Sequence, residues 1–385
     1  MPRLPLIVIA DDLTGAAELA ALAHQAGLRA VVLTEPPRRA VPADVIVCDS
    51  GTRLASPAAA ARAVKLLARR LRAIPNGGIF KKVDSVLRGN VMVEIEACME
   101  VFGLERTLLV PCNPSLGRSI NNGRYYIAGV PLHKTPFARE PHHPRKTCLV
   151  DRLLADGTSA VKCHHPAEEL PRAGVSVGEA SSPADVALWA SRLDAGTFPA
   201  GGADFFRMWL QHLRVGKRIA PAPPPRMRAT LMLSGTATPT DPVTPLPGPA
   251  LALDPVKLPK PGPLAAAAFA HLRAGKMVSV FIQAKPKGGK GSSPAINRIF
   301  LHLIRRLRPT KAFDHVLIAG GTTTALVLES LDWHRLEVVH VWGPGVVTLR
   351  PIEAPAILVT TKPGSYQWPV NLRRHFSAPV ELAAG

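Results

Sequence analysis

Groups of acidic, basic and hydroxyl side chains follow four short apolar segments in the first half of the chain. They are Asp11 and Asp12, then Asp49, Ser50 and Arg53, then Lys82, Asp84, Ser85 and Arg88, and last Asn113 and Arg118. Arginine and lysine bind carboxylates, arginine through its two-pronged guanidinium. Arg53, at the end of a strand, is the natural clamp for a substrate carboxylate. Aspartate accepts hydrogen bonds from hydroxyl groups and can act as a general base. Together these side chains suit a small acid that carries several hydroxyl groups.

The elements around these side chains decide whether the groups can meet. Short apolar runs predict strands at residues 6–10, 29–33, 44–48, 78–82 and 106–110. Helical patterns lie at residues 16–26, 57–73 and 91–102, the first with Thr14 as its N-cap. Strands that alternate with helices predict a parallel sheet, and the carboxyl ends of its strands share one edge. We therefore expect the four groups to lie together at that edge, where ligands bind.

Two features of the first half allow more than one interpretation. Asp12 could simply offset the dipole of the helix that follows, although the adjacent acids Asp11 and Asp12 exceed that need. Residues 112–150 are irregular and rich in Pro, Asn, Gly and His. A segment of this length and composition predicts a loop that is either functional or poorly ordered.

The second half repeats the alternation of strands and helices. Strands are predicted at residues 230–233, 278–283, 315–319, 336–342 and 356–360, and helices at 263–274, 295–307 and 323–331. Residues 236–263 are rich in proline and predict a loop. The proline-rich run Ile219–Pro225 predicts a semi-rigid linker. The expected fold is α/β with two domains, residues 1–220 and 228–385, each a largely parallel sheet flanked by helices.

Paired glycines in the second half predict a phosphate site. Gly320 and Gly321 separate a predicted strand from a predicted helix, whose N-terminus offers free N–H groups to a phosphate. Ser234 and Gly235 follow another strand in the same way. The alternative is a glycine turn with a threonine cap. No segment matches the pattern G-x-x-x-x-G-K-[ST], and the basic run 285–293, with the wrong spacing for it, predicts a mobile loop.

Composition narrows the class of protein. The net charge of +19 attracts anions, which include nucleic acids, acidic lipids, nucleotides and carboxylates. The basic residues between 62 and 72 predict a solvated helix face, and no basic block is interleaved with aromatics as in a nucleic-acid groove. Five cysteines without a C-x-x-C motif indicate a reducing compartment. The short apolar N-terminus predicts neither a signal peptide nor a membrane span, so we expect a cytoplasmic protein that binds no membrane.

A protein-bound metal is not predicted. The histidine pairs at 142–143 and 164–165, with Cys148 and Cys163, fit no standard zinc spacing. Cys112 has no histidine placed beside it by the sequence, so we do not expect it to act as a nucleophile.

Seven segments taken together resemble the four-carbon acid sugar kinase family. They are IADDLTGAAELA (9–20), KKVDSVLRGN (81–90), PCNPSLGRSINNGRYYIAGVPLHKTPFA (111–138), LSGT (233–236), IAGGTTTALVLESL (318–331), PGV (344–346) and TTKPGSYQWP (360–369). They occur in the family's order and span both halves of the chain. The resemblance implies an N-terminal domain that binds a sugar acid such as threonate, erythronate or 3-oxo-tetronate, and a C-terminal domain that binds ATP.

The resemblance also implies roles for individual residues. Substrate binding falls to Asp11, Asp12, Arg53, Lys82, Asp84 and Ser85, and nucleotide binding to Ser234, Gly320, Gly321, Thr322, Thr323 and Gly364. Catalytic roles fall to Asp12, Lys82, Asp84 and Arg88. Mg²⁺ would bridge the phosphates of ATP, either Asp12 or Asp84 would orient or deprotonate the hydroxyl, and Lys82 and Arg88 would offset charge on the transferred group. The linker would let the domains close.

The nucleotide motifs depart from the family pattern and leave two other functions open. Thr322 stands where the family has an acidic residue, Lys362-Pro363-Gly364 replaces the pattern K-S-G, and no glutamine follows Ser234 within residues 236–244. One alternative is therefore a sugar-acid-binding protein that has lost catalysis. The other, motivated by the charge, is a nucleic-acid-binding protein. The sequence leaves open which acid is bound and whether the chain forms a homo-oligomer.

Overall fold

The chain divides into two compact units, Met1–Ala220 and Pro221–Gly385. In the computed structural model, the residues described below are 4–37, 41–140, 142–217, 220, 222–235, 246, 248–254, 257–282, 294–364 and 366–377. Each unit is described by itself. The predicted linker, Ile219–Pro225, lies partly outside the described residues.

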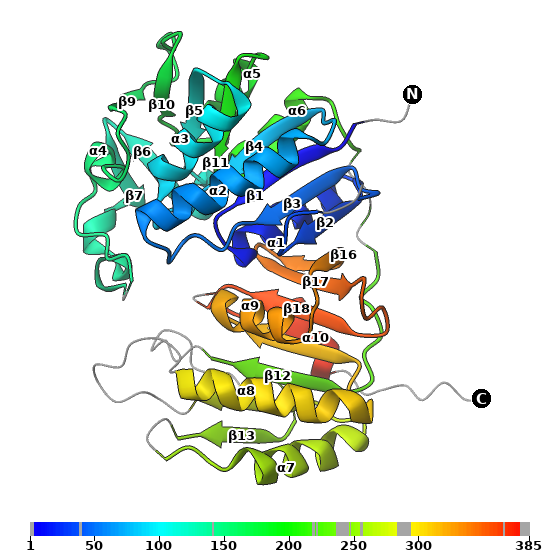
Figure 1. Ribbon diagram of the computed structural model, residues 1–385. Coiled ribbons are helices and arrows are strands. Elements are labelled where there is room, and N and C mark those ends of the chain that lie inside the picture. Colours follow the sequence, from blue (N-terminus) through cyan, green and yellow to red (C-terminus); the bar gives the residue numbers. More distant parts are fainter. Residues whose placement is uncertain are drawn as a thin grey trace. The chain divides into compact units, whose positions relative to one another are not determined.

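The first unit contains a parallel sheet with the strand order β2-β3-β1-β4-β11-β5-β10-β9 (Figure 1). Its strands are β1 Leu6–Ala10, β2 Ala30–Leu33, β3 Val45–Asp49, β4 Gly78–Lys82, β5 Arg106–Val110, β9 Val161–His164, β10 Gly174–Gly178 and β11 Thr197–Gly201. All five residues of β1 are buried. Such a continuous apolar run is typical of a parallel strand with both faces covered.

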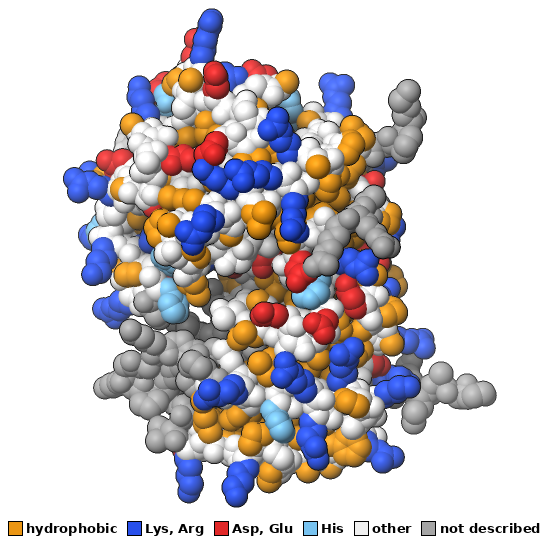
Figure 2. All heavy atoms as spheres, in the orientation of Figure 1, with side chains coloured by type: hydrophobic (Ala, Val, Ile, Leu, Met, Phe, Trp, Pro, Cys, Tyr) orange, Lys and Arg blue, Asp and Glu red, His pale blue; other side chains and the backbone are white. Residues whose placement is uncertain are grey.

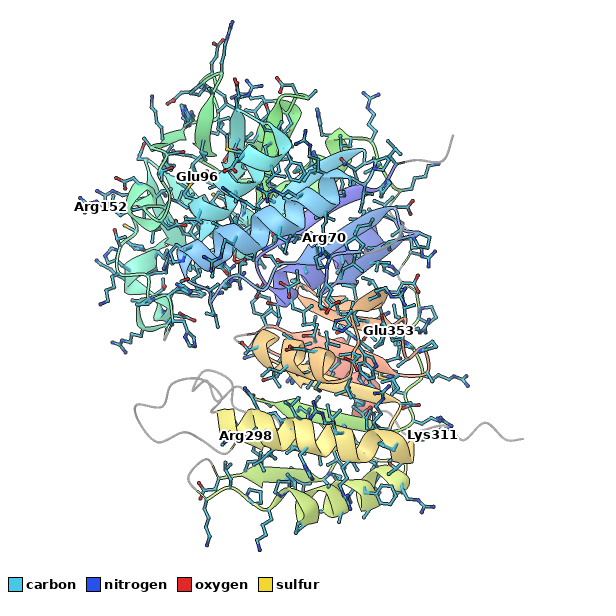
Figure 3. The ribbon with its side chains drawn as sticks, viewed as in Figure 1. Arg70, Glu96, Arg152, Arg298, Lys311 and Glu353 are labelled. Atoms are coloured by element: carbon cyan, nitrogen blue, oxygen red, sulfur yellow. The ribbon has the colours of Figure 1, made fainter. Side chains whose placement is uncertain are left out.

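Helices of the first unit pack on this sheet. They are α1 Leu13–Gln25, α2 Pro57–Arg72, α3 Val91–Phe102, α4 Val150–Leu153, α5 Pro183–Ser191 and α6 Ala203–His212. Val64 and Leu67 of α2 join Ile7 and Ile46 of the sheet in one apolar cluster. The opposite face of α2 is exposed and carries arginines such as Arg70, labelled in Figure 3. The prediction of a solvated basic face is therefore confirmed.

Two predictions for the first unit were wrong. The N-cap of α1 is Asp12 rather than Thr14, and the helix begins at Leu13. Residues 111–149, which we call the insert, contain regular structure where an irregular loop was expected. The elements of the insert are the antiparallel strands β6 Arg118–Asn121, β7 Arg124–Ile127 and β8 Val130–Pro131 and the 3₁₀ turns η1 Pro114–Leu116, η2 Leu132–Lys134 and η3 Pro136–Arg139. Strands this short carry too little periodicity to be recognised in a sequence.

The second unit has the strand order β13-β14-β12-β15-β18-β17-β16. Its strands are β12 Thr230–Ser234, β13 Ala250–Leu253, β14 Val278–Ile282, β15 His315–Ala319, β16 Arg335–Gly343, β17 Val346–Pro351 and β18 Leu358–Lys362. From β13 to β18 the neighbours are parallel, and β17 is antiparallel to both β18 and β16. Both units are thus largely parallel α/β sheets, which confirms the predicted fold class.

Helices α7 Pro261–Arg273, α8 Pro294–Leu307, α9 Gly321–Ser330 and α10 Val370–Ser377 and the 3₁₀ turn η4 Arg308–Thr310 complete the described elements of the second unit. β13 lies inside the predicted loop 236–263, so that part of the prediction was wrong. β17 was not predicted at all. The two residues that separate it from β16, Pro344 and Gly345, form a tight turn, which the positive φ of Gly345 (67°) permits.

A chain of neutral polar side chains crosses the interior of the second unit. His315 forms hydrogen bonds with the hydroxyls of Thr230 (3.0 Å) and Thr360 (2.8 Å), and Thr360 contacts Thr348 at 2.6 Å. The indole of Trp342 donates to the Thr348 hydroxyl at 2.8 Å. Burial lowers the pKa of His315 to about 3, so this histidine is neutral.

Basic side chains are scattered over the visible surfaces of both units in Figure 2 rather than gathered in one patch. No helix among the described residues is long and apolar enough to cross a membrane.

Candidate functional site

Three neighbouring strands of the first unit end at the same level. Ala10, the last residue of β1, pairs with Asp49 of β3 and with Lys82 of β4. The loops after these strands therefore begin side by side. The expectation that the charged groups meet at the carboxyl edge is confirmed by the contacts described below.

Arg53 is the centre of this edge. Its guanidinium holds Asp11 with two prongs, Nε to Oδ2 at 2.7 Å and Nη2 to Oδ1 at 2.8 Å. Nη1 donates to Oδ2 of Asp12 at 2.5 Å and lies 3.6 Å from Oδ1 of Asp84. Burial would raise the pKa of Asp11, but the charges of Arg53 and Lys81 hold it below its usual value. The arginine expected to grip a substrate carboxylate is thus already occupied by carboxylates of the protein.

Asp84 has no oxygen left unused. It receives Nη2 of Arg88 at 2.8 Å on one oxygen and Nε of Arg88 at 3.0 Å on the other. The second oxygen also accepts the backbone N–H groups of Val86 (3.1 Å) and Arg88 (3.0 Å). Burial opposes ionisation, yet Arg88 and Arg53 hold the pKa of Asp84 well below its usual value. A carboxylate so fully bonded is a poor proton acceptor.

Asp12 is more open than Asp84, with 21% of its side chain exposed against 5%. One oxygen caps α1 by accepting the N–H of Gly15 at 2.8 Å, and the other accepts the hydroxyl of Thr14 at 2.5 Å. A Cβ at position 15 would lie 2.8 Å from the capping oxygen, so a larger residue there would displace the carboxylate of Asp12 from the cap. Asp12 therefore stabilises the N-terminus of α1, and part of its side chain is still exposed to solvent.

Lys82 and Lys81 are consecutive in β4 and point to opposite faces of the sheet. Nζ of Lys82 donates to the carbonyl of Val83 at 2.8 Å and lies 3.5 Å from Glu18. Nζ of Lys81 lies 2.7 Å from Oε2 of Glu94, and both side chains are at most 1% exposed. Lys81 and Glu94 were not predicted as part of the site.

The buried pair of Lys81 and Glu94 supports the loop that carries Arg53. The other oxygen of Glu94 accepts the hydroxyl of Thr52 at 2.7 Å. The backbone N–H groups of Thr52 (3.0 Å) and Arg53 (3.1 Å) in turn donate to the carbonyl of Asp11. The sequence showed a lysine and a glutamate, but not that α3 brings them together beneath this loop.

Asp49 was expected at this edge, but no role in binding or catalysis was predicted for it. Its Oδ1 accepts the N–H of Gly51 at 2.8 Å, the only hydrogen bond to its side chain from the described residues. Burial first, and then the negative charge of Asp12, raise its pKa to about 7. The signal for it was present in the sequence, because Asp49 directly follows a buried run.

The insert reaches back to the loop after β4. Nη1 of Arg118 donates to the hydroxyl of Ser85, and the hydroxyl of Tyr125 donates to the Ser85 carbonyl. Arg145 donates to the carbonyl of Leu87 at 2.7 Å. Leu87 has a φ of 60°, an uncommon backbone for a side-chain-bearing residue that the surrounding contacts must hold. The segment expected to be irregular therefore organises the site.

The predicted nucleotide residues lie at the carboxyl edge of the second unit. The register places Ser234 beside Ala319, and Ala319 beside Lys362. Between β15 and α9, Gly320 has φ 107° and ψ 126° and donates its N–H to the carbonyl of Lys362 at 3.0 Å. This backbone suits glycine alone. The helix begins at Gly321 and its N-cap is Gly320, so the predicted start at Thr323 and the alternative of a threonine cap were wrong.

The other predicted nucleotide residues differ in exposure. Thr322 is exposed, whereas Thr323 is 4% exposed, and Gly364 lies just beyond β18 in a turn. Lys362, which was not predicted, is 1% exposed and places Nζ 5.1 Å from the ring centre of Trp368. The basic run 285–293 and the segment 236–244 lie outside the described residues.

No cluster of three or more His, Cys, Asp and Glu side chains suited to a metal ion occurs among the described residues.

Comparison with known proteins finds a different family model in each unit. A family model described as a sugar-binding N-terminal domain matches residues 6–187, and one described as a nucleotide-binding C-terminal domain matches residues 263–366. The chain belongs to the four-carbon acid sugar kinase family.

Two relatives and one solved structure illustrate the extent of the match. The D-erythronate kinase of Heliobacterium modesticaldum is 32% identical over 39% of this chain, which corresponds to only 35% of that enzyme. The 3-oxo-tetronate kinase of Brucella melitensis is 27% identical over 91% of this chain and 90% of its own. A Salmonella typhimurium structure superposes with a TM-score of 0.76 at 20% identity, covering 95% of this chain and 96% of the other. At that identity the likeness shows the fold alone.

Proposed function

We propose that this protein transfers the γ-phosphoryl group of ATP to a hydroxyl of a four-carbon sugar acid. The observation that carries the proposal is the convergence of Asp11, Asp12, Arg53 and Asp84 at the carboxyl edge of the first unit. A nucleotide as phosphoryl donor is supported by the nucleotide-binding family model, and a four-carbon sugar acid as acceptor by the names of the relatives.

Asp12 is the better of the two predicted candidates for orienting the attacking hydroxyl. It retains exposed surface, whereas both oxygens of Asp84 are filled by Arg88 and by backbone N–H groups. In this proposal Asp84 and Arg53 are positioning residues, which fix Arg88 and the acids of the β1 loop. Arg88 and Lys82 offset negative charge on the group in transfer.

The nucleotide would be bound by backbone N–H groups more than by charged side chains. The Gly320 turn and the first N–H groups of α9, at Gly321, Thr322 and Thr323, suit a phosphate, and Ser234 and Gly364 belong to adjacent strand ends. Mg²⁺ would neutralise and bridge the phosphates of ATP. Catalysis would then consist mainly of positioning and electrostatic stabilisation.

A coupled assay of ADP release over a panel of four-carbon sugar acids tests the proposal. We expect one acid to give turnover that needs both ATP and Mg²⁺. Asp12→Asn should lower kcat by about 100-fold, in the range for loss of a proton-handling group, whereas Glu100→Gln on the surface of α3 should not. Binding of an acid without any turnover would instead favour a non-catalytic binding protein.

A further inference from the structure

The positive side chains at the carboxyl edge of the first unit differ in whether they have a counterion. Arg53 is paired with Asp11 and Asp12, and Arg88 with Asp84. Arg118 lies beside them, yet no carboxylate of the described residues lies within ion-pair distance of it.

Arg118 is held in place by contacts that leave most of its donors free. It begins β6, and its N–H donates to the carbonyl of Asn113 at 3.0 Å. The guanidinium packs 5.9 Å from the ring centre of Phe137, which also contacts Arg88 at 5.6 Å. A guanidinium has five N–H donors, and only the one to Ser85 has a partner among the described residues.

The local charge is unbalanced as a result. Asp84 and Glu140 both lie within ion-pair distance of Arg88, and Asp84 also lies 3.6 Å from Arg53, but neither is within ion-pair distance of Arg118. Arg145 uses its guanidinium on two backbone carbonyls, those of Leu87 and His143. A half-buried arginine is costly without an anion. The carboxylate of a ligand would supply an anion for Arg118, and its two oxygens match the two-pronged guanidinium.

We propose that Arg118, together with the Ser85 hydroxyl, binds the carboxylate of the sugar acid. The inference rests on the proposed function for the class of ligand. The sequence suggested Arg53 for this role, but two N–H groups of the Arg53 guanidinium already donate to Asp11. The hydroxyl end of the acid is then left for Asp12. In this arrangement the insert selects acids over neutral sugars.

Calorimetric titration without nucleotide tests the inference independently of turnover. The ligands are D-erythronate, D-threonate and erythritol, the last with an alcohol in place of the carboxylate. The variants are Arg118→Gln and Arg118→Lys, and the control is Arg139→Gln, an exposed arginine of the same insert. Thermal melting of each preparation confirms that it is folded.

Arg118→Gln should weaken binding of the acid by about 10- to 100-fold, the range for one charge-assisted interaction. Arg118→Lys should fall between this variant and the wild type, because it keeps the charge but loses the fork. Arg139→Gln should bind the acid normally, and erythritol should bind all four proteins equally weakly.

Three results would overturn the inference: acid binding unchanged in both folded Arg118 variants, an equal loss for acid and erythritol, or no binding of either acid to the wild type. If the wild type binds the acid through Arg118 but releases no ADP, the proposed kinase activity fails while the carboxylate site stands.

Discussion

The carboxyl edges of the two sheets offer a ligand different kinds of group. In the first unit the edge is formed by charged side chains, with Arg53 tied to Asp11 and Asp12. In the second unit it is formed by backbone, with the N–H groups that follow Gly320 and the strand end at Ser234. Side chains can discriminate between small ligands by charge and shape, whereas backbone N–H groups donate hydrogen bonds to any phosphate of suitable geometry.

The buried polar side chains of the two units also differ, because those of the first unit are charged and those of the second are neutral. The first unit buries an ion pair, Lys81 with Glu94, under its charged edge. The second unit buries a neutral chain that runs from Thr230 through His315 to Thr360. A buried charge is tolerated only with its partner, whereas a neutral hydrogen bond can be lost at lower cost. We therefore expect the first unit to be the more sensitive to single polar substitutions.

The largest effect is expected for Lys81→Met. Removal of one partner leaves the carboxylate of Glu94 buried and uncompensated, so the free energy of unfolding should fall by about 3–5 kcal/mol. Urea unfolding monitored by circular dichroism measures this value. Because Glu94 holds Thr52 beside Arg53, binding of the sugar acid should weaken as well.

Lys65→Met provides the matched control. Lys65 pairs with Glu100 on the surface between α2 and α3, with side chains 33% and 58% exposed. Loss of an exposed pair should change the free energy of unfolding by at most about 1 kcal/mol. Equal losses of unfolding free energy in the two variants would mean that the Lys81–Glu94 pair contributes no more than a surface pair. The first unit would then not be more sensitive to polar substitution on account of its buried charges.

A smaller effect is expected at the glycine turn of the second unit. Gly320→Ala should lower the free energy of unfolding by about 2 kcal/mol, because φ 107° is unfavourable for alanine. Gly321 begins α9 without a positive φ, so Gly321→Val should remain folded. In the proposed function, however, its side chain would push the phosphates away and weaken ATP binding.

Melting temperature and ATP affinity, measured on the same preparations of both variants, separate the two effects. An unchanged ATP affinity in folded Gly321→Val would argue against this turn as the phosphate site. It would then favour a phosphate site elsewhere in the second unit.

The sequence predicted the strands and the edge they share because both depend on local patterns. Continuous apolar runs marked β1 and β4, and the polar residues after them were bound to meet once the strands were parallel. The pairing of charges was beyond prediction, because it depends on which loops approach each other. Arg53 looked like a free carboxylate clamp until the structure placed Asp11 against it.

The insert shows a second limit. Strands of two to four residues, such as β8, carry no measurable period, so the segment resembled a loop. Its function depends on contacts across long stretches of sequence, such as the one between Arg118 and Ser85. The raised pKa of Asp49 has the same origin, because burial and a charge on another loop set it.

The smallest expected effect concerns Asp49 and depends on pH. Its pKa in the folded protein, about 7, lies above the ordinary value of 3.8. The stability that comes from holding this proton is therefore present at low pH and is lost as the pH rises through 7. Asparagine keeps an oxygen for the N–H of Gly51 and never ionises. Asp49→Asn should accordingly raise the free energy of unfolding by about 1–2 kcal/mol at pH 8, after allowance for partial exposure, and by less at pH 5.

Asp194→Asn is the control of opposite sign for Asp49→Asn. Hydrogen bonds from Arg106 and Thr197 lower the pKa of Asp194 to about 2, so the stability it contributes is present above its ordinary pKa of 3.8 and is lost only in stronger acid. Between pH 5 and 8 this variant should therefore show a constant small loss, while Asp49→Asn shows a gain that grows with pH. Urea unfolding of both variants at the two pH values measures the difference. A gain for Asp49→Asn that is the same at pH 5 and pH 8 would mean that Asp49 is ionised throughout, and that the crowding of acids at this edge is fully offset by Arg53.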